Sequence, residues 1–167
     1  MAQVSESSAS LIRQGAGPIP PNLHWVIVLA CSLLTGFFWY IWMFVQSVWV
    51  KKIDPASRAT WLYVWSMIAL LPMFPLMAAA VLVVPTAENP AVPALEILLG
   101  LLILGLASTA LCVAAAFDIR ASLLRYYNSA EPIGLKLSAP MTLFFQVLYL
   151  QYHFTRIAGW KETGVLA

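Results

Sequence analysis

The residues whose types and spacing suit chemistry lie close to the C-terminus. Five polar side chains follow one another there at steps of four, three, four and three: Thr142, Gln146, Tyr149, His153 and Arg156. These steps match one face of an α-helix, which we expect over residues 139–160. In a membrane, such a polar face lies at the water interface or in helix packing, lines a path for solutes or protons, or binds a partner. The sequence leaves these alternatives open and favours the interfacial or packing role.

No other set of side chains has the spacing of a catalytic or metal centre. The two cysteines, Cys31 and Cys112, lie inside apolar runs and match no metal-binding pattern. A haem held by His24 and His153 would need both rings in one helix layer, whereas headgroup-level positions explain both residues more simply. Because no Ser–His–Asp set and no paired carboxylates occur either, we expect no catalytic residue, no cofactor and no metal, and a protein that is not an enzyme.

The composition indicates a membrane protein. Hydrophobic residues make up 62% of the chain and charged residues 10%, whereas a soluble domain carries about 25% charged residues. A chain of 167 residues with this composition cannot hide its apolar side chains in one soluble core. The net charge of +2 is too small to indicate a nucleic-acid partner. We therefore expect membrane lipids around the chain.

The stretch over residues 24–52 predicts the first membrane span. No charged residue precedes Lys51 and Lys52 in this stretch, and the run exceeds the ~20 apolar residues that cross a bilayer. Tryptophan and tyrosine crowd its second half, as at a helix end on a membrane surface. We predict a helix over about 24–50, preceded by a flexible tail over 1–23 that is rich in Ser, Ala, Gly and Pro.

A second span is predicted over about 60–84, with a kink in its middle. Pro72 and Pro75 each remove one backbone donor there. The carbonyls of Ile68 and Leu71 then lose their helical partners. We expect this face of the helix to turn towards neighbouring helices, because lipid offers no donors.

The third span is predicted over about 95–117 and carries a helix-packing seam. Small residues share one of its faces: Gly105, Ser108, Cys112 and Ala116. We expect the helix to continue out of the bilayer to Tyr127. The last helix, over 139–160, is amphipathic, and its apolar part, Met141–Phe154, is only about 20 Å long. It therefore spans the bilayer or lies in the interface, and residues 161–167 form a C-terminal tail.

Basic residues predict the orientation. The segments Lys51–Ala59 and Asp118–Ser138 carry Lys and Arg, whereas the loop Pro85–Ala94 has none. We expect the two basic segments in the cytoplasm and the loop outside. With a spanning first helix, the N-terminus also lies outside. Glu131 is expected to form a surface ion pair with one of the basic residues on either side of it.

The first span resembles the leading helix of a group of small bacterial integral membrane proteins of unknown function. A threonine–glycine pair is followed by aromatic residues and tryptophan in the stretch Leu34–Trp42, which reads LTGFFWYIW. Val45-Gln46 and the basic Val50-Lys51-Lys52 come next. The resemblance covers the first span and its loop. It implies a bacterial inner-membrane location and no particular activity.

We therefore predict an all-α integral membrane protein with three clear transmembrane helices and a fourth, amphipathic helix that spans or lies in the interface. The transmembrane helical domain covers residues 24–160. We expect this multi-pass chain to pack as a homo-oligomer or with a larger membrane partner, as a non-enzymatic accessory subunit. The alternative is a small oligomeric channel or carrier for ions, protons or small solutes, which rests on the kinked second span and the polar face.

Overall fold

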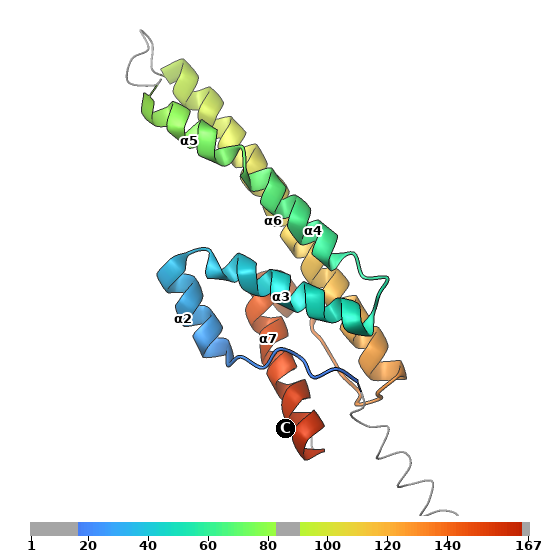
Figure 1. Cartoon of the computed structure of the whole chain (residues 1–167). Helices are drawn as coiled ribbons and strands as arrows, with labels where there is room; N and C mark the ends of the chain where they lie inside the picture. The colour runs from blue at the N-terminus through green and yellow to red at the C-terminus, as the bar shows by residue number, and fades with distance from the viewer. Residues whose placement is uncertain (1–16, 83–90, 165–167) are drawn as a thin grey trace, which may run out of the picture. The chain divides into compact units, whose positions relative to one another are not determined.

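The structure is a computed structural model that describes residues 17–82 and 91–164. Helices account for 81% of these residues and no strand occurs among them, so the predicted all-α class is confirmed. The elements shown in Figure 1 are α2 (Trp25–Thr35), α3 (Phe38–Ile53), α4 (Ala59–Leu70), α5 (Met73–Leu82), α6 (Ala91–Ser129) and α7 (Ala139–Thr163). Residues 1–16 of the predicted tail, residues 83–90 at the end of the predicted second span and in the loop after it, and residues 165–167 lie outside the described part.

The chain divides into two compact units that differ in charge. One combines residues 1–60 and 115–167, and the other is the single stretch 61–114. Every Lys and Arg of the sequence falls in the first unit, whereas Glu96 is the one charged residue in the described part of the second. We call the first the charged unit and the second the apolar unit. Helix α6 begins in the apolar unit and ends in the charged unit.

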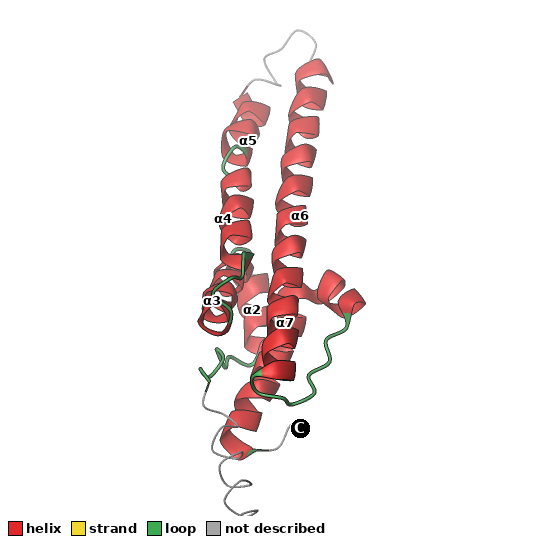
Figure 2. Cartoon of the chain, turned by 90° about the vertical axis from the view of Figure 1, so that its right-hand side faces the viewer, coloured by secondary structure: helices red, strands yellow, loops and turns green. Residues whose placement is uncertain are grey.

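Two helical stretches of the described residues are long and apolar enough to cross a membrane. They are Ala59–Leu82, which comprises α4 and α5, and Ala91–Ser129, which is α6. Only 6% and 11% of the residues in their most apolar windows are buried, whereas a core helix of a soluble protein is mostly buried. In the apolar unit, α4 and α5 lie side by side with α6 (Figures 1 and 2). The prediction of three clear spans is not confirmed.

The predicted single helix over 24–50 is wrong, because the chain turns at Gly36. Helix α2 ends at Thr35, Gly36 has a φ of 72°, and α3 begins at Phe38. Glycine adopts positive φ at little cost, and the Thr35 hydroxyl accepts the Phe38 N–H at 3.1 Å, which caps the new helix. The two helices pack against each other and against α7. With 11 and 16 residues they measure about 16 and 24 Å, less than the ~30 Å core.

Between α4 and α5 the helix is interrupted at Leu71 and Pro72. We expected the carbonyls of Ile68 and Leu71 to need partners on other helices, but both accept from N–H groups nearby in the chain. Leu71 N–H donates to the Ile68 carbonyl at 3.1 Å, and Phe74 N–H donates to the Leu71 carbonyl at 3.3 Å. Tight local turns thus replace the helical bonds that the prolines remove.

Helix α7 is longer than predicted and is broken inside. It runs to Thr163, so residues 161–163 belong to the helix and not to a C-terminal tail. Gln146 has φ 32° and ψ −105°, which joins two helical pieces across a kink. The steps of three and four that define a helical face therefore do not continue across Gln146.

Candidate functional site

The kink divides the polar face that the sequence predicts on α7. Thr142 is buried and its hydroxyl donates to the Ser138 carbonyl at 2.8 Å, while Tyr149 Oη accepts the Ser138 N–H at 2.8 Å. His153 is buried edge-on against the Tyr149 ring, with centroids 4.7 Å apart. Gln146 is half-buried at the kink itself. These side chains serve the packing of α7 and the loop before it.

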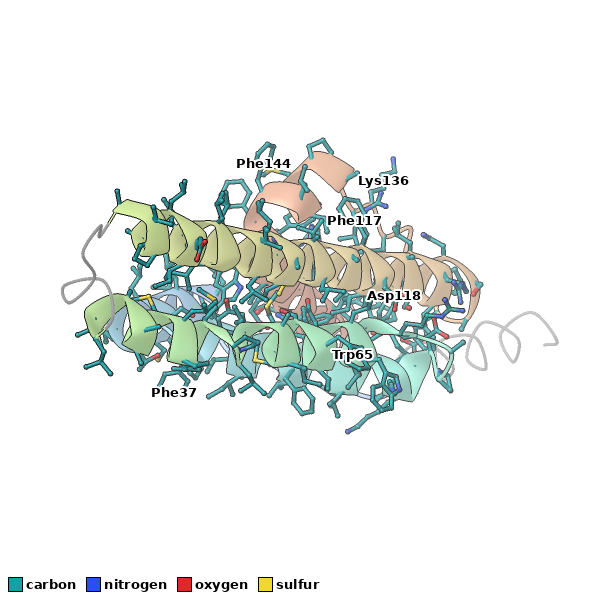
Figure 3. The ribbon with its side chains drawn as sticks, turned by 90° about the horizontal axis from the view of Figure 1, so that it is seen from above. Phe37, Trp65, Phe117, Asp118, Lys136 and Phe144 are labelled. Atoms are coloured by element: carbon teal, nitrogen blue, oxygen red, sulfur yellow. The ribbon has the colours of Figure 1, made fainter. Side chains whose placement is uncertain are left out.

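The fifth residue of that face, Arg156, lies over a different ring. Its guanidinium carbon is 5.7 Å from the centroid of Tyr152, a cation–π contact. Phe144, two residues before the kink at Gln146, projects from α7 with 76% of its surface exposed (Figure 3).

A buried amide cluster joins α3 to α7. Gln46 and Gln151 are fully buried, and Gln46 Nε2 donates to Gln151 Oε1 at 3.1 Å and to the Val147 carbonyl at 3.2 Å. Trp42 Nε1 donates to the same Gln151 oxygen at 2.8 Å. The Gln46 nitrogen and the Gln151 oxygen therefore meet partners that water would otherwise supply, while Gln46 Oε1 has none among the described residues.

Side chains of α3 and α7 also hold the residues that precede α2. We call residues 17–24 the N-terminal strap. Gln151 Nε2 donates to the carbonyls of Pro21 and Leu23 at 3.0 and 2.6 Å, and Trp49 Nε1 donates to the Ile19 carbonyl at 2.8 Å. Prolines in the strap lack an N–H, so its carbonyls are the groups that the protein recognises. The predicted free tail over 1–23 is therefore wrong for residues 17–23.

The beginning of the strap is fixed by a buried ion pair. Lys161 Nζ lies 3.0 Å from Glu131 Oε2, and the two side chains are 2% and 4% exposed. Gly17 N–H donates to Glu131 Oε1 at 2.7 Å, and Lys161 Nζ donates to the Gly17 carbonyl at 2.9 Å. A Cβ at Gly17 would overlap Tyr126 Oη and Glu131 Oε1, so a larger residue there would displace these side chains.

This ion pair corrects two predictions. Glu131 does not pair at the surface with its flanking basic residues: Arg125 contacts Asp54, and Lys136 is exposed (Figure 3). Because Gly17 touches both Glu131 and Lys161, these three residues lie on one side of any membrane that the chain crosses. An external position for Gly17 and a cytoplasmic position for Glu131 are therefore incompatible.

Two aspartates of the charged unit bind other segments: Asp118 binds the start of α4, and Asp54 binds α6. Asp118 Oδ2 accepts the Ser57 hydroxyl at 2.6 Å and the N–H groups of Arg58 and Ala59 at 2.8 and 2.9 Å (Figure 3). Asp54 Oδ2 accepts the Ser122 hydroxyl at 2.7 Å. A carboxylate at a helix N-terminus satisfies free N–H groups and complements the helix dipole.

Only the two central residues of the predicted seam, Ser108 and Cys112, contact another helix of the apolar unit. Ser108 and Cys112 are buried, and the Ser66 hydroxyl of α4 lies 2.8 Å from Ser108 Oγ and 3.0 Å from Cys112 Sγ. Gly105 has no atom within 4 Å of the place a Cβ would take. Ala116 is buried but belongs to the charged unit. The seam therefore joins α6 to α4 through two of its four residues.

The two histidines have separate roles. His24 Nδ1 accepts the Val26 N–H at 3.3 Å and caps α2. Burial, with a smaller contribution from the Arg156 charge, lowers the pKa of His153 to about 4, so this ring is neutral at pH 7. In residues 17–82 and 91–164, no group of three or more His, Cys, Asp or Glu side chains is placed to hold a metal ion.

Gln46, Gln151 and Trp49 are the site residues that the sequence analysis missed. Gln46 carries a signal, because it is an amide among apolar residues of α3 and burying it alone costs on the order of 2–7 kcal/mol. Gln151 carries none, since Thr142, Gln146, His153 and Arg156 make its own helix polar as well. Comparison with protein-family models, curated proteins and solved structures finds no match for this chain.

Proposed function

We propose that the chain is a multi-pass membrane protein whose apolar unit crosses the bilayer, and that it serves as a non-enzymatic packing or accessory subunit of a membrane assembly. The observation that carries this proposal is the exposure of large apolar side chains on α4, α5 and α6. On α4, α5 and the turn between them these are Trp61, Trp65, Leu71, Phe74, Met77, Val81 and Leu82, each more than half exposed. An aqueous monomer rarely exposes a continuous surface of this kind, whereas lipid or a partner helix covers it.

The polar side chains support a structural role. Gln46, Gln151 and Trp49 bind backbone or one another, and Asp118 and Glu131 are engaged with the chain's own N–H groups. A catalytic or transport site needs polar groups that converge on a ligand. In the part of the chain that the structure describes, these groups converge on the protein itself.

The charge distribution supports a hairpin topology. The stretch α4–α5 begins beside a segment that carries Lys and Arg, α6 ends in another, and the loop between the two stretches has none. The positive-inside rule then keeps residues 51–59 and 118–138 in the cytoplasm. Because Gly17 and Lys161 contact Glu131, the strap and the end of α7 stay on that side too. The resemblance of the first helix favours a bacterial inner membrane.

The alternative of a small channel or carrier rests on the kink between α4 and α5 and on a continuous polar face on α7. The kink at Gln146 and the burial of Thr142 and His153 weaken the second basis. Proton, ion or solute flux through vesicles that contain the purified protein would support the alternative over the packing role.

An oxidative cross-linking scan tests the packing role. Single cysteines replace exposed residues of α6 one at a time from Leu102 to Thr109, in a Cys31→Ala, Cys112→Ala background. We expect disulfide-linked dimers, or links to one fixed partner, at positions that repeat every three to four residues. Absence of any such period, with a monomeric mass in native mass spectrometry, would overturn the role as a packing subunit.

A further inference from the structure

A shallow groove of about 400 Å³ runs between the N-terminal strap and α3. The strap contributes Ile19 and Pro21 to its wall. The α3 residues in the groove share one face of that helix: Phe44, Val45, Val48, Trp49 and Lys52. From Phe44 to Lys52 this face extends about 12 Å along the helix axis. All of these residues belong to the charged unit.

The groove is apolar along its length and cationic at one end. Phe44, Val45 and Val48 are 46%, 36% and 40% exposed, so apolar surface remains open in the groove. Lys52 is exposed at the other end, in the last turn of α3. A row of apolar side chains that ends in tryptophan and lysine is typical of a membrane–water boundary.

Among the residues that the structure describes, Lys52 forms no ion pair with a carboxylate. Asp54 accepts from Ser122 and forms an ion pair with Arg125 at 3.1 Å. Asp118 is engaged by the start of α4. The groove wall is also held in place, because Trp49 Nε1 donates to the Ile19 carbonyl at 2.8 Å across it.

We propose that this groove binds one anionic phospholipid, with an acyl chain along Phe44, Val45 and Val48 and the phosphate on Lys52. The order of groups in the groove, apolar and then cationic, complements the order of groups in such a lipid. Lysine binds phosphate as a point charge that a flexible stem can direct. The inference rests on the proposed membrane insertion, since only a bilayer supplies this ligand at high concentration.

Lipid competition tests the charged end of the groove. The protein, purified in a mild detergent, receives equal amounts of phosphatidylglycerol and phosphatidylcholine with identical acyl chains, and native mass spectrometry counts the bound lipids. We expect one phosphatidylglycerol to be retained preferentially. Lys52→Gln lowers that preference about fivefold, the effect of one lysine near an anionic surface. Lys136→Gln, an exposed lysine outside the groove, leaves it unchanged. Equal effects of the two substitutions would overturn the site.

Photocross-linking tests the apolar part. A phosphatidylglycerol with a diazirine in its acyl chain is expected to label the peptide that contains Phe44 and Val48. Val48→Trp fills the groove and removes this label, while circular dichroism checks that the variant keeps its helices. A label spread over α4 and α6 and unaffected by Val48→Trp contradicts the proposal.

The outcomes separate the two proposals. If the protein is extracted without detergent and retains no lipid of either kind, membrane insertion itself fails. If it needs detergent and retains both lipids without preference, the hairpin proposal stands and the lipid site alone fails.

Discussion

At the scale of single residues, the charged unit is held together by polar side chains that bind backbone. Gln151 joins three segments: its Nε2 donates to the strap carbonyls of Pro21 and Leu23, and its Oε1 accepts from Trp42 and Gln46 of α3. A buried amide stabilises the fold only when its partners are present. A buried polar atom without a hydrogen bond costs more free energy than one satisfied hydrogen bond contributes.

Gln151→Leu is therefore expected to lower the free energy of unfolding by about 1–3 kcal/mol. Gln146→Leu is the matched control, because it makes the same change in the same helix at a half-buried position. Chemical unfolding in detergent, followed by circular dichroism, measures both variants. Limited proteolysis reports release of the strap in the first variant only. Equal losses in the two variants would refute the role given to Gln151.

Lys161→Met removes one partner of a buried ion pair. The Glu131 charge then stays buried, and we expect a loss of about 3–5 kcal/mol in the free energy of unfolding. Adding Glu131→Gln to this variant recovers part of the loss. Arg125→Met breaks the pair with Asp54, in which the arginine is 67% exposed, and costs at most about 1 kcal/mol. A loss at Lys161 no larger than that at Arg125 contradicts the burial of the pair.

The buried His153 makes the free energy of unfolding fall as the pH falls. Its pKa is lowered to about 4 in the folded protein, and an unfolded histidine titrates near ~6.5. Between these values the unfolded chain binds more protons, so the His153 contribution is complete above pH 6.5 and is lost as the pH falls towards 4. His153→Gln flattens the unfolding free energy over this range, whereas His24→Asn, which keeps a capping acceptor, does not. A pH dependence that survives His153→Gln is the contrary result.

These residue roles differ in how far a sequence predicts them. After the kink, Val147, Leu150, Phe154 and Ile157 follow steps of three and four and are buried, whereas Leu143, which precedes the kink, is 43% exposed. The partner of Glu131 was not predictable from its neighbours in the chain. Its cation, Lys161, comes from the far end of α7, and burial removes the solvent screening that a surface pair has.

At the scale of elements, local chain signals decide which boundaries are predictable. The interruption at Pro72 lies where proline chemistry requires it. As expected, α6 runs on past Phe117, and it ends at Ser129, two residues beyond the predicted Tyr127. The turn at Gly36 was missed because glycine is common inside membrane helices. The kink at Gln146 has no residue signal, since neither proline nor glycine occupies the position.

The contact of α4 with α6 gives a prediction at this scale. Ser108→Leu forces a larger side chain into a buried contact with Ser66 and is expected to cost about 1–3 kcal/mol. Gly105→Ala, about one turn away on the same helix, adds a Cβ that meets no atom within 4 Å and should not destabilise the protein. Unfolding in mixed micelles with rising dodecyl sulfate measures the difference. The reverse order of stabilities would show that the seam faces another direction.

At the scale of the whole molecule, the charge pattern and the contact pattern divide the chain at the same places. Residues 61–114 form a unit with Glu96 as the one charge in its described part, and the remainder carries every Lys and Arg. Helix α6, with 39 residues, measures about 58 Å, twice the ~30 Å hydrocarbon core. Its charged end, from Asp118 onward, must therefore leave the bilayer if its apolar part crosses.

The central claim, that the apolar unit crosses the membrane as a hairpin with its open end in the cytoplasm, is tested most directly by cysteine accessibility. Single substitutions Ala91→Cys, Ser129→Cys and Glu162→Cys are made in a Cys31→Ala, Cys112→Ala background and treated in intact cells with a thiol reagent that does not cross membranes. The account predicts reaction at position 91 alone, and reaction at 129 and 162 together only after the membrane is opened. Reaction at 129 but not 91 in intact cells, or different sides for 129 and 162, would contradict it.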